Sequence, residues 1–241
     1  MITETTVVNQ EEKSPTFTQG MKDCVPTLLG YMSIGFAFGI VGVASNLSVM
    51  EIALLSALVY AGAAQFIICA LLVVNSPMSA IIITTFIVNL RNFLLSATLA
   101  PHFTKYSLMK NLGIGILVTD ESFGVASNKI IKGEPINDRW MNGLNVTAYI
   151  FWILSCVAGA ICGNWISNPE VFGLDFALIA MFLALLVLQL ESVIHSKLKQ
   201  YLCLIVYMTI AMILLSLFIE SHLAVIIATI IVATIGVVTD K

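Results

Sequence analysis

A charged side chain inside an apolar stretch is the residue of this sequence most able to do chemistry. Arg91 lies near the middle of an apolar stretch from residue 81 to residue 97, and Asn89 and Asn92 flank it. Arginine does not lose its charge in a protein. Placing it near the centre of a bilayer costs about 2.5–3.5 kcal/mol on insertion scales. It therefore needs an anion, carbonyl groups or water beside it, and it is a candidate for binding an anionic solute group.

The helix expected around Arg91 has one polar face. Steps of three or four residues stay on the same side of a helix, and this side carries Thr85, Asn89, Asn92 and Ser96. The alternatives to a binding role for Arg91 are a structural ion pair and a side chain that reaches out to the membrane surface. Its place near the middle of the predicted span 78–99 argues against the second. We expect this face to be wet or packed against protein.

Two adjacent carboxyl groups are the second expensive feature. Asp120 and Glu121 interrupt the apolar stretch 111–130. Consecutive residues point about 100° apart on a helix, so one acid can pair with Arg91 while the other exchanges a proton. That arrangement suits proton coupling. The alternative is an extramembrane loop in which both acids are solvated.

Small and polar residues of the first two apolar stretches complete a candidate pocket. Gly35 and Gly39 have the spacing typical of close helix packing, and also of a helix that breaks and offers backbone groups to a ligand. Tyr60 and Gln65 lie among small residues, where the alternative to lining a pocket is an interhelical hydrogen bond. The predicted substrate-binding residues are Gly35, Gly39, Tyr60, Gln65, Asn89, Arg91 and Asn92, and the predicted proton-coupling residues are Asp120 and Glu121.

The composition indicates a membrane around these residues. The chain of 241 residues is 59% hydrophobic and 10% charged, with a mean hydropathy of +0.99, whereas a soluble domain carries about 25% charged residues. This is the composition of an all-α polytopic membrane protein, with no feature of a nucleic-acid binder. Residues 1–20 lack the apolar core of a secretory signal. We expect them to form a disordered cytoplasmic tail before a single transmembrane domain, 21–241.

Eight segments are long enough to be transmembrane helices of about 20 apolar residues. They are 24–45, 52–74, 78–99, 111–130, 141–163, 172–190, 201–219 and 222–239. A seven-span alternative folds 111–130 back as a re-entrant segment. With eight spans, only Lys105 and Lys110 lie opposite the N-terminus, so the positive-inside rule favours eight, with both termini cytoplasmic. Some of these helices are expected to break in the membrane.

The sequence does not decide whether the chain contains an internal repeat. Glu51 opens the second span and Asp175 opens the sixth, as in a duplicated transporter with halves 21–133 and 138–241. Acids also suit any helix N-terminus, so chance explains the similarity equally well. The cysteines and histidines have no metal-ligand or redox spacing, so we predict no metal, no cofactor and no enzyme activity. An intramembrane enzyme and a non-transporting assembly subunit remain the alternatives to a transporter.

Four motifs in order carry a resemblance to a known family. They are Gly30-Tyr31 with Gly35-Phe-Ala-Phe-Gly39, Tyr60-Ala-Gly-Ala-Ala-Gln65-Phe66, Asn89-Leu-Arg91-Asn92 and Thr119-Asp120-Glu121-Ser-Phe123. In order and spacing, over about residues 20–190, the chain resembles the AzlC family, the large subunits of bacterial branched-chain amino acid exporters. The family often has an acid before the arginine and a histidine after it, where this chain has Asn89 and Asn92.

The resemblance implies a function that composition does not show. It implies export of valine, leucine or isoleucine, sometimes methionine, across the bacterial cell membrane. It also implies a small hydrophobic partner subunit of the AzlD type and a proton gradient as the energy source. On this basis, Arg91 would bind the substrate carboxylate, and Asp120 or Glu121 would bind the ammonium group or the coupling proton.

Overall fold

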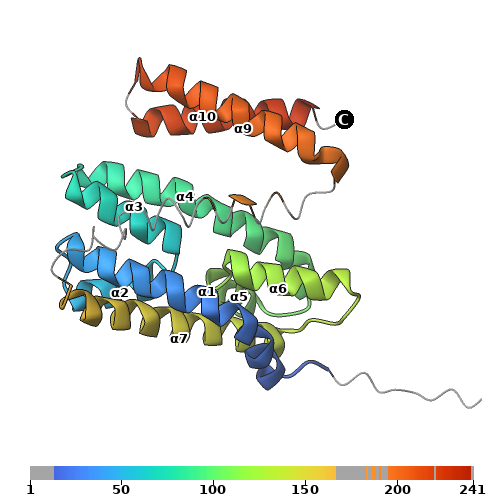
Figure 1. The fold of residues 1–241 in the computed structure, drawn as a ribbon. Coiled ribbons are helices and arrows are strands. Elements are labelled where there is room, and N and C mark those ends of the chain that lie inside the picture. The colour runs from blue at the N-terminus through green and yellow to red at the C-terminus, as the bar shows by residue number, and fades with distance from the viewer. Residues whose placement is uncertain are drawn as a thin grey trace, which may run out of the picture.

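The described part of the chain is built from helices. The computed structural model describes residues 14–166, 195–219 and 221–239, with Leu183, Leu186, Val187 and Leu190. Most of the predicted tail and of the predicted span 172–190 lies outside the described residues. In chain order the elements are α1 (Phe17–Ala44), α2 (Val49–Leu58), α3 (Gly62–Val73), α4 (Met78–Leu99), the 3-10 helix η1 (Ala100–Phe103), α5 (Leu108–Ile116), α6 (Asp120–Ile131), α7 (Asp138–Gly163), α9 (His195–Ser216) and α10 (Ser221–Thr239) (Figure 1).

Four of the described helices are long and apolar enough to cross a membrane. They are Phe17–Ala44, Met78–Phe103, Asp138–Gly163 and Lys197–Ser216. Together with the composition, they define a multi-pass membrane protein. The shorter helices α2, α3, α5 and α6 lie between the long ones, and α9 and α10 form a separate antiparallel hairpin (Figure 1).

The long helices α1 and α7 run in parallel and form the packed centre. Gly20 near the start of α1 faces Trp140 near the start of α7, whereas Gly39 further along α1 faces Cys156 further along α7. A Cβ atom at either glycine would overlap a backbone carbonyl of α7. Of the two expectations for the glycine pair of α1, close helix packing is the one confirmed, because α1 continues unbroken through it.

The helices α2 and α3 form a pair that turns back to the end at which it began. Ile52 of α2 packs on Gly42 at the end of α1. At the other end of α2, the Tyr149 hydroxyl, midway along α7, donates a 2.9 Å hydrogen bond to a carbonyl of α2. From there α3 returns along α1, where Phe66 and Phe38 are in edge contact with ring centroids 5.5 Å apart.

The helix α5 begins at the opposite end of the bundle. Lys110 in its first turn lies 2.7 Å from the carboxylate of Asp138, the first residue of α7. One turn later, the Ile114 carbonyl accepts a 3.1 Å hydrogen bond from Asn145. Since Asn145 lies two turns into α7, α5 rises into the bundle from the end where α7 starts.

The helix α6 then returns to that same end. Thr119, which caps its N-terminus, hydrogen-bonds to Tyr31 midway along α1. Lys129, in its last turn, lies 3.9 Å from Asp23 near the start of α1. The helices α5 and α6 are therefore a second re-entrant pair, entering from the end opposite to α2 and α3.

These two pairs change the predicted count of spans. The predicted spans 52–74 and 111–130 are each broken and folded back, with breaks at 59–61 and 117–119 near the middle of the bundle. The re-entrant alternative for 111–130 agrees with the structure, and 52–74 is a correction to the sequence prediction. A hydropathy count does not detect such a turn, because both arms of a re-entrant pair are apolar. The eight-span prediction is thus not confirmed.

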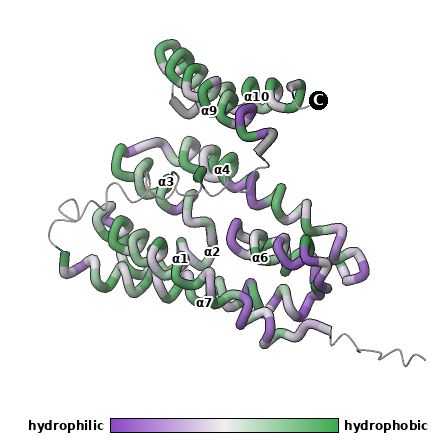
Figure 2. Tube along the Cα trace, turned by 45° about the vertical axis from the view of Figure 1, so that its right-hand side comes forward, coloured by the Kyte–Doolittle hydropathy of each residue, from purple (hydrophilic) through white to green (hydrophobic). Residues whose placement is uncertain are grey.

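Basic side chains gather at one end of the bundle. Within residues 14–166, every basic residue except Arg91 lies at the end where α1 and α7 begin, as contacts and chain connections place them: Lys22, Lys105, Lys110, Lys129, Lys132 and Arg139. Figure 2 shows hydrophilic residues around α6 and the start of α7. The sequence prediction had placed Lys105 and Lys110 on the opposite side. They change sides because the α2–α3 pair, which precedes them in the chain, does not cross the bundle.

The described helices contain a repeated order. A long helix followed by a re-entrant pair occurs as α1–α3 and again, in the opposite direction, as α4–α6 (Figure 1). This repetition falls within residues 17–131, inside the first of the two predicted halves. The predicted relation between 21–133 and 138–241 stays a prediction, because part of the second half lies outside the described residues.

Candidate functional site

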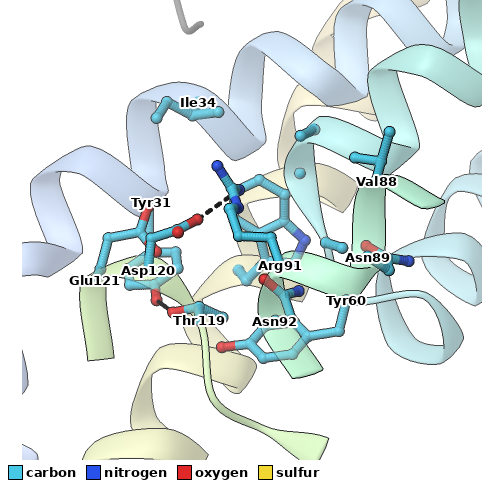
Figure 3. A pocket seen from close by; sticks show the side chains of 14 residues that line it. Tyr31, Ile34, Tyr60, Val88, Asn89, Arg91, Asn92, Thr119, Asp120 and Glu121 are labelled. Carbon is cyan, nitrogen blue, oxygen red and sulfur yellow. Dashed lines mark hydrogen bonds and ion pairs between the residues drawn. The ribbon is translucent and has the colours of Figure 1, made fainter. Parts of the chain in front are cut away.

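A polar cavity lies where the two breaks meet (Figure 3). Its water-accessible volume is about 50 Å³. The lining comes from α1, α4, α7 and both breaks, and consists of Tyr31, Ile34, Tyr60, Ala61, Gly62, Ala63, Val88, Asn89, Arg91, Asn92, Thr119, Asp120, Glu121 and Trp152. The cavity therefore joins residues that are far apart in the sequence and that enter from opposite ends of the bundle.

An ion pair spans the cavity between α4 and α6. A guanidinium nitrogen of Arg91 lies 2.6 Å from a carboxylate oxygen of Asp120 (Figure 3), and the two side chains are 34% and 24% exposed. This confirms that one of the two adjacent acids pairs with Arg91. The guanidinium Nε has no hydrogen-bond partner among the described residues. Arg91 therefore keeps donor capacity for a further acceptor.

The N-terminus of α6 is capped and anchored. Thr119 and Ser122 form a capping box, in which the Thr119 amide donates to the Ser122 hydroxyl at 2.9 Å and the Ser122 amide donates to the Thr119 hydroxyl at 3.3 Å. The Tyr31 hydroxyl shares a hydrogen bond with Thr119 (Figure 3). Acids in the first turn are stabilised by the helix dipole, and Asp120 and Glu121 occupy that turn. Glu121 lines the cavity and forms no ion pair with any described residue.

The N-terminus of α3 is built differently. Its N-cap residue is Ala61, and no described side chain caps the helix. Tyr60, just before it, has φ of 41°, which lies in the left-handed region that aromatic residues seldom adopt. The Tyr60 ring packs edge-on against Tyr149, with ring centroids 4.9 Å apart. The Tyr60 hydroxyl has no hydrogen-bond partner among the described residues.

Six of the predicted site residues line this cavity, and three lie elsewhere. The six are Tyr60, Asn89, Arg91, Asn92, Asp120 and Glu121. Gly35 and Gly39 face α7 in close helix packing and do not line this cavity, so their role in substrate binding stays a prediction. Gln65 is fully buried behind the cavity, where its side-chain oxygen accepts a 3.1 Å hydrogen bond from the Trp152 indole. Gln65 thus supports a lining residue.

Sequence reasoning missed several lining residues. Thr119 could have been found, since a Thr followed three residues later by Ser122 at the start of a helix resembles a capping pattern. Tyr31 lies in a quoted motif, but nothing in its neighbours indicates a site. Trp152 is in an ordinary apolar span and carries no sequence signal. Only the fold brings these side chains to the breaks.

A larger and more apolar cavity adjoins the first. It has a water-accessible volume of about 520 Å³ and shares Tyr60, Asn89 and Asn92 with the smaller cavity. From there it follows α4 past Ser96 and reaches Asn111 on α5. Three residues of the polar face predicted for α4, Asn89, Asn92 and Ser96, therefore line this cavity, which extends toward the basic end of the bundle.

The fold and the site define a polytopic helical membrane protein with two re-entrant pairs meeting at a charged internal cavity. The chain matches the family model described as AzlC protein over residues 26–166. Since the match covers more than half of the chain, the protein belongs to the AzlC family, which confirms the resemblance. No solved structure matches the chain.

Three relatives illustrate the range of the similarity. The inner membrane protein YgaZ of Escherichia coli is 28% identical over 195 residues, which cover 79% of this chain and 77% of the relative. An uncharacterized membrane protein of Archaeoglobus fulgidus is 31% identical over 189 residues, 75% of this chain and 78% of the relative. The branched-chain amino acid transport protein AzlC of Bacillus subtilis is 23% identical over 167 residues, 68% of this chain and 64% of the relative.

Proposed function

We propose that this protein is a secondary transporter subunit that exports branched-chain amino acids across the bacterial cell membrane, driven by proton movement. The observation that carries the proposal is the Arg91–Asp120 ion pair, with Glu121 beside it, in a cavity at the junction of two opposed re-entrant pairs. Ionisable residues inside a membrane domain are costly and mark substrate or ion pathways. The name of the Bacillus subtilis relative supports branched-chain amino acids as the substrate class.

The cavity has the charges that a zwitterion needs. A free amino acid brings a carboxylate and an ammonium group into a poorly solvated space, and each group needs an opposite charge. Arg91 takes the carboxylate, while Asp120 or Glu121 takes the ammonium group. The substrate inserts into an existing ion pair, so the charges of Arg91 and Asp120 stay compensated in the empty and the loaded state. Ile34 and Val88 supply apolar lining for the aliphatic side chain.

Glu121 is the better candidate for the coupling proton. Asp120 is engaged by Arg91 at 2.6 Å, whereas Glu121 lines the same cavity without an ion-pair partner among the described residues. Proton uptake by Glu121 breaks no ion pair, whereas proton uptake by Asp120 would leave Arg91 without its counter-ion. In this proposal, Asp120 stays charged for the substrate while Glu121 gains and loses a proton.

The charge distribution supports one orientation in the membrane. Lys and Arg are enriched on the cytoplasmic side of membrane proteins, so the basic end of the bundle is proposed to be cytoplasmic, with both termini on that side. The larger cavity leads toward this end along α4 and α5. The described conformation is thus proposed to be the one that receives substrate from the cytoplasm.

A small hydrophobic subunit of the AzlD type is proposed as the partner. The outward face of α4 exposes large apolar side chains, among them Ile82, Phe86 and Leu94, which are 61%, 66% and 62% exposed. Lipid or an apolar subunit can cover this face, and the family resemblance is the reason to propose the subunit.

Counterflow of radiolabelled leucine in proteoliposomes, with and without the partner subunit, tests the proposal. We expect Arg91→Ala, expressed and folded at the normal level, to lose at least about a hundredfold in rate, because Asp120 is left unpaired and the carboxylate loses its cation. Arg139→Ala is the matched control, since Arg139 lies at the exposed basic end. Wild-type counterflow by Arg91→Ala would rule out this site. The absence of any counterflow by the wild-type protein with its partner would favour an enzyme or an assembly subunit.

A further inference from the structure

The first turn of α3 presents backbone donors that have no acceptor among the described residues. The first three N–H groups of a helix have no partner inside it. In α3 the Gln65 amide is the first to donate inside the helix, to the Ala61 carbonyl at 2.9 Å. The N–H groups of Gly62, Ala63 and Ala64 precede it, and no described side chain caps them. Since buried unpaired N–H groups are rare in proteins, we expect an acceptor to enter from the cavity.

A second unpaired donor lies at the same place. Tyr60 is only 7% exposed, its hydroxyl has no hydrogen-bond partner among the described residues, and it lines the cavity (Figure 3). A buried hydroxyl without a partner is costly. Its backbone, with φ of 41°, is strained for a residue with a side chain, and such strain clusters at ligand sites. Two independent features thus indicate the same kind of ligand group, a hydrogen-bond acceptor.

The charges around the cavity select an anion for this position. The N-terminus of a helix carries a partial positive charge, and α3 has no acid in its first turn to offset it. Arg91 lines the same cavity, and its Nε has no hydrogen-bond partner among the described residues. The carboxylates of Asp120 and Glu121 lie at the other break, on α6. The α3 side of the cavity therefore presents a helix N-terminus without an acid of its own, and the α6 side carries both carboxylates.

We propose that the N-terminus of α3 and the Tyr60 hydroxyl form the carboxylate subsite of the transported amino acid. This inference rests on the proposed function and makes it more specific. The backbone donors fix where the carboxylate lies, and Arg91 bridges it to Asp120. A ligand without the carboxylate, such as isoamylamine, which is leucine without that group, leaves these donors unpaired and binds poorly.

Substituting the N-cap residue tests this directly in the purified full-length protein. An Asp at an N-cap accepts hydrogen bonds from the first N–H groups of its helix, so Ala61→Asp places a tethered carboxylate in the proposed subsite. We expect its affinity for leucine to fall about a hundredfold or more. Isoamylamine still places its ammonium group beside the acids on α6. The introduced carboxylate now accepts from the α3 donors that isoamylamine leaves unpaired in the wild-type protein. We expect the order to reverse, with Ala61→Asp binding isoamylamine more tightly than leucine.

Tyr60→Phe is the milder variant, because it removes only the hydroxyl. We expect leucine to bind about tenfold more weakly and isoamylamine to bind as it does to the wild-type protein. Ser48→Asp adds an acid at the N-cap of α2, outside the cavity, and Tyr207→Phe removes a hydroxyl on α9. Both controls should bind leucine like the wild type. Dissociation constants come from equilibrium displacement of radiolabelled leucine, with thermal melts to verify folding.

The outcomes separate the two proposals. If wild-type protein binds leucine but Tyr60→Phe and a folded Ala61→Asp bind it equally well, the carboxylate lies elsewhere and the subsite is wrong. A folded Ala61→Asp that loses leucine without gaining isoamylamine would also overturn it. If the wild type binds no branched-chain amino acid, the proposed function fails, and the subsite fails with it.

Discussion

The two breaks have the same geometry and opposite chemistry. Each joins two short helices and points the N-terminus of the second into the shared cavity. At α6 the cap is Thr119, the first turn carries two acids, and Tyr31 anchors the cap to α1. At α3 the cap is Ala61, the first turn carries no acid, and no described side chain takes up its donors.

This difference shows how a repeated fold can serve an unsymmetrical solute. A pair of identical breaks would present two equal positive helix ends. Acids at α6 reverse the sign at one break, while the bare N-terminus of α3 keeps the other positive. An amino acid has opposite charges on neighbouring atoms, so a cavity of this kind fixes its orientation. The repetition of α1–α3 by α4–α6 supplies the frame, and a few substitutions at the caps supply the polarity.

Among changes at the α6 break, the largest effect is expected from removing Glu121, which has no ion-pair partner among the described residues. Glu121→Gln keeps the size of the side chain but cannot exchange a proton. We expect leucine counterflow to stay near the wild-type rate, because exchange moves no net proton. Efflux driven by a pH gradient should fall about tenfold or more, as for loss of a proton-transfer group. The measurement is leucine efflux from loaded vesicles with an imposed pH gradient and after its dissipation.

Glu51→Gln is the matched control for the coupling measurement. Glu51 lies in the first turn of α2, where its carboxylate accepts hydrogen bonds from Ser48 outside the cavity. The control should respond to the pH gradient like the wild type. If Glu121→Gln still responds fully, the proton binds elsewhere, with Asp120 the next candidate. If wild-type efflux ignores the gradient, proton coupling itself is wrong.

A smaller effect is expected from removing the N-cap of α6, which makes the α6 break resemble the uncapped α3 break. Thr119→Ala removes the cap of α6 and leaves the Tyr31 hydroxyl without its bond. Loss of an N-cap lowers the free energy of unfolding by about 0.5–2 kcal/mol. The Tyr31 hydroxyl also loses its partner, so we expect Thr119→Ala at the upper end of this range. Thr16→Ala, which uncaps α1 at its exposed start, should lie at the lower end. Thermal melts in detergent compare them, and an equal loss in both would show that the Tyr31–Thr119 contact adds nothing.

The sequence predicted the charged residues that line the cavity better than it predicted the helix breaks that form it. Arg91, Asp120 and Glu121 were found because charges inside apolar stretches are costly wherever the fold puts them. The α2–α3 break was missed, because Tyr60-Ala61-Gly62 contains no charge, no proline and no capping side chain. The uninterrupted hydropathy of 52–74 therefore looked like the clearest span of all.

Residues that depend on distant contacts could not be predicted. Gly39 has the same spacing pattern whether it packs against α7 or lines a cavity, and only the parallel course of α1 and α7 decides between them. Trp152 became a lining residue because α7 passes the α3 break. The positions of Lys105 and Lys110 followed from the number of crossings before them, so one misread segment moved both to the wrong side.

The smallest effect is expected at the end of the α5–α6 pair that lies away from the cavity, near the starts of α1 and α7. Lys129 at the end of α6 lies 3.9 Å from Asp23 and 5.5 Å from the Trp140 ring centre. Its ammonium group also donates to Glu134, and this hydrogen bond holds the pKa of Glu134 below its ordinary value. A lowered pKa stabilises the fold above the unfolded value of about 4.3, and the gain disappears as pH falls below it.

We therefore expect Glu134→Gln to lower the melting temperature slightly near pH 7, and we expect the difference to shrink as pH falls below about 4.3 and to vanish below the lowered pKa of Glu134. The effect is small because Glu134 is exposed and its ion pair is screened by solvent. Melts in detergent across this pH range are the measurement. Thr16→Ala at the start of α1 breaks a hydrogen bond between two uncharged groups, the Thr16 hydroxyl and the Gln19 amide, so its effect should persist at low pH. A Glu134→Gln effect that also persisted at low pH would show that the charge on Glu134 does not anchor this pair.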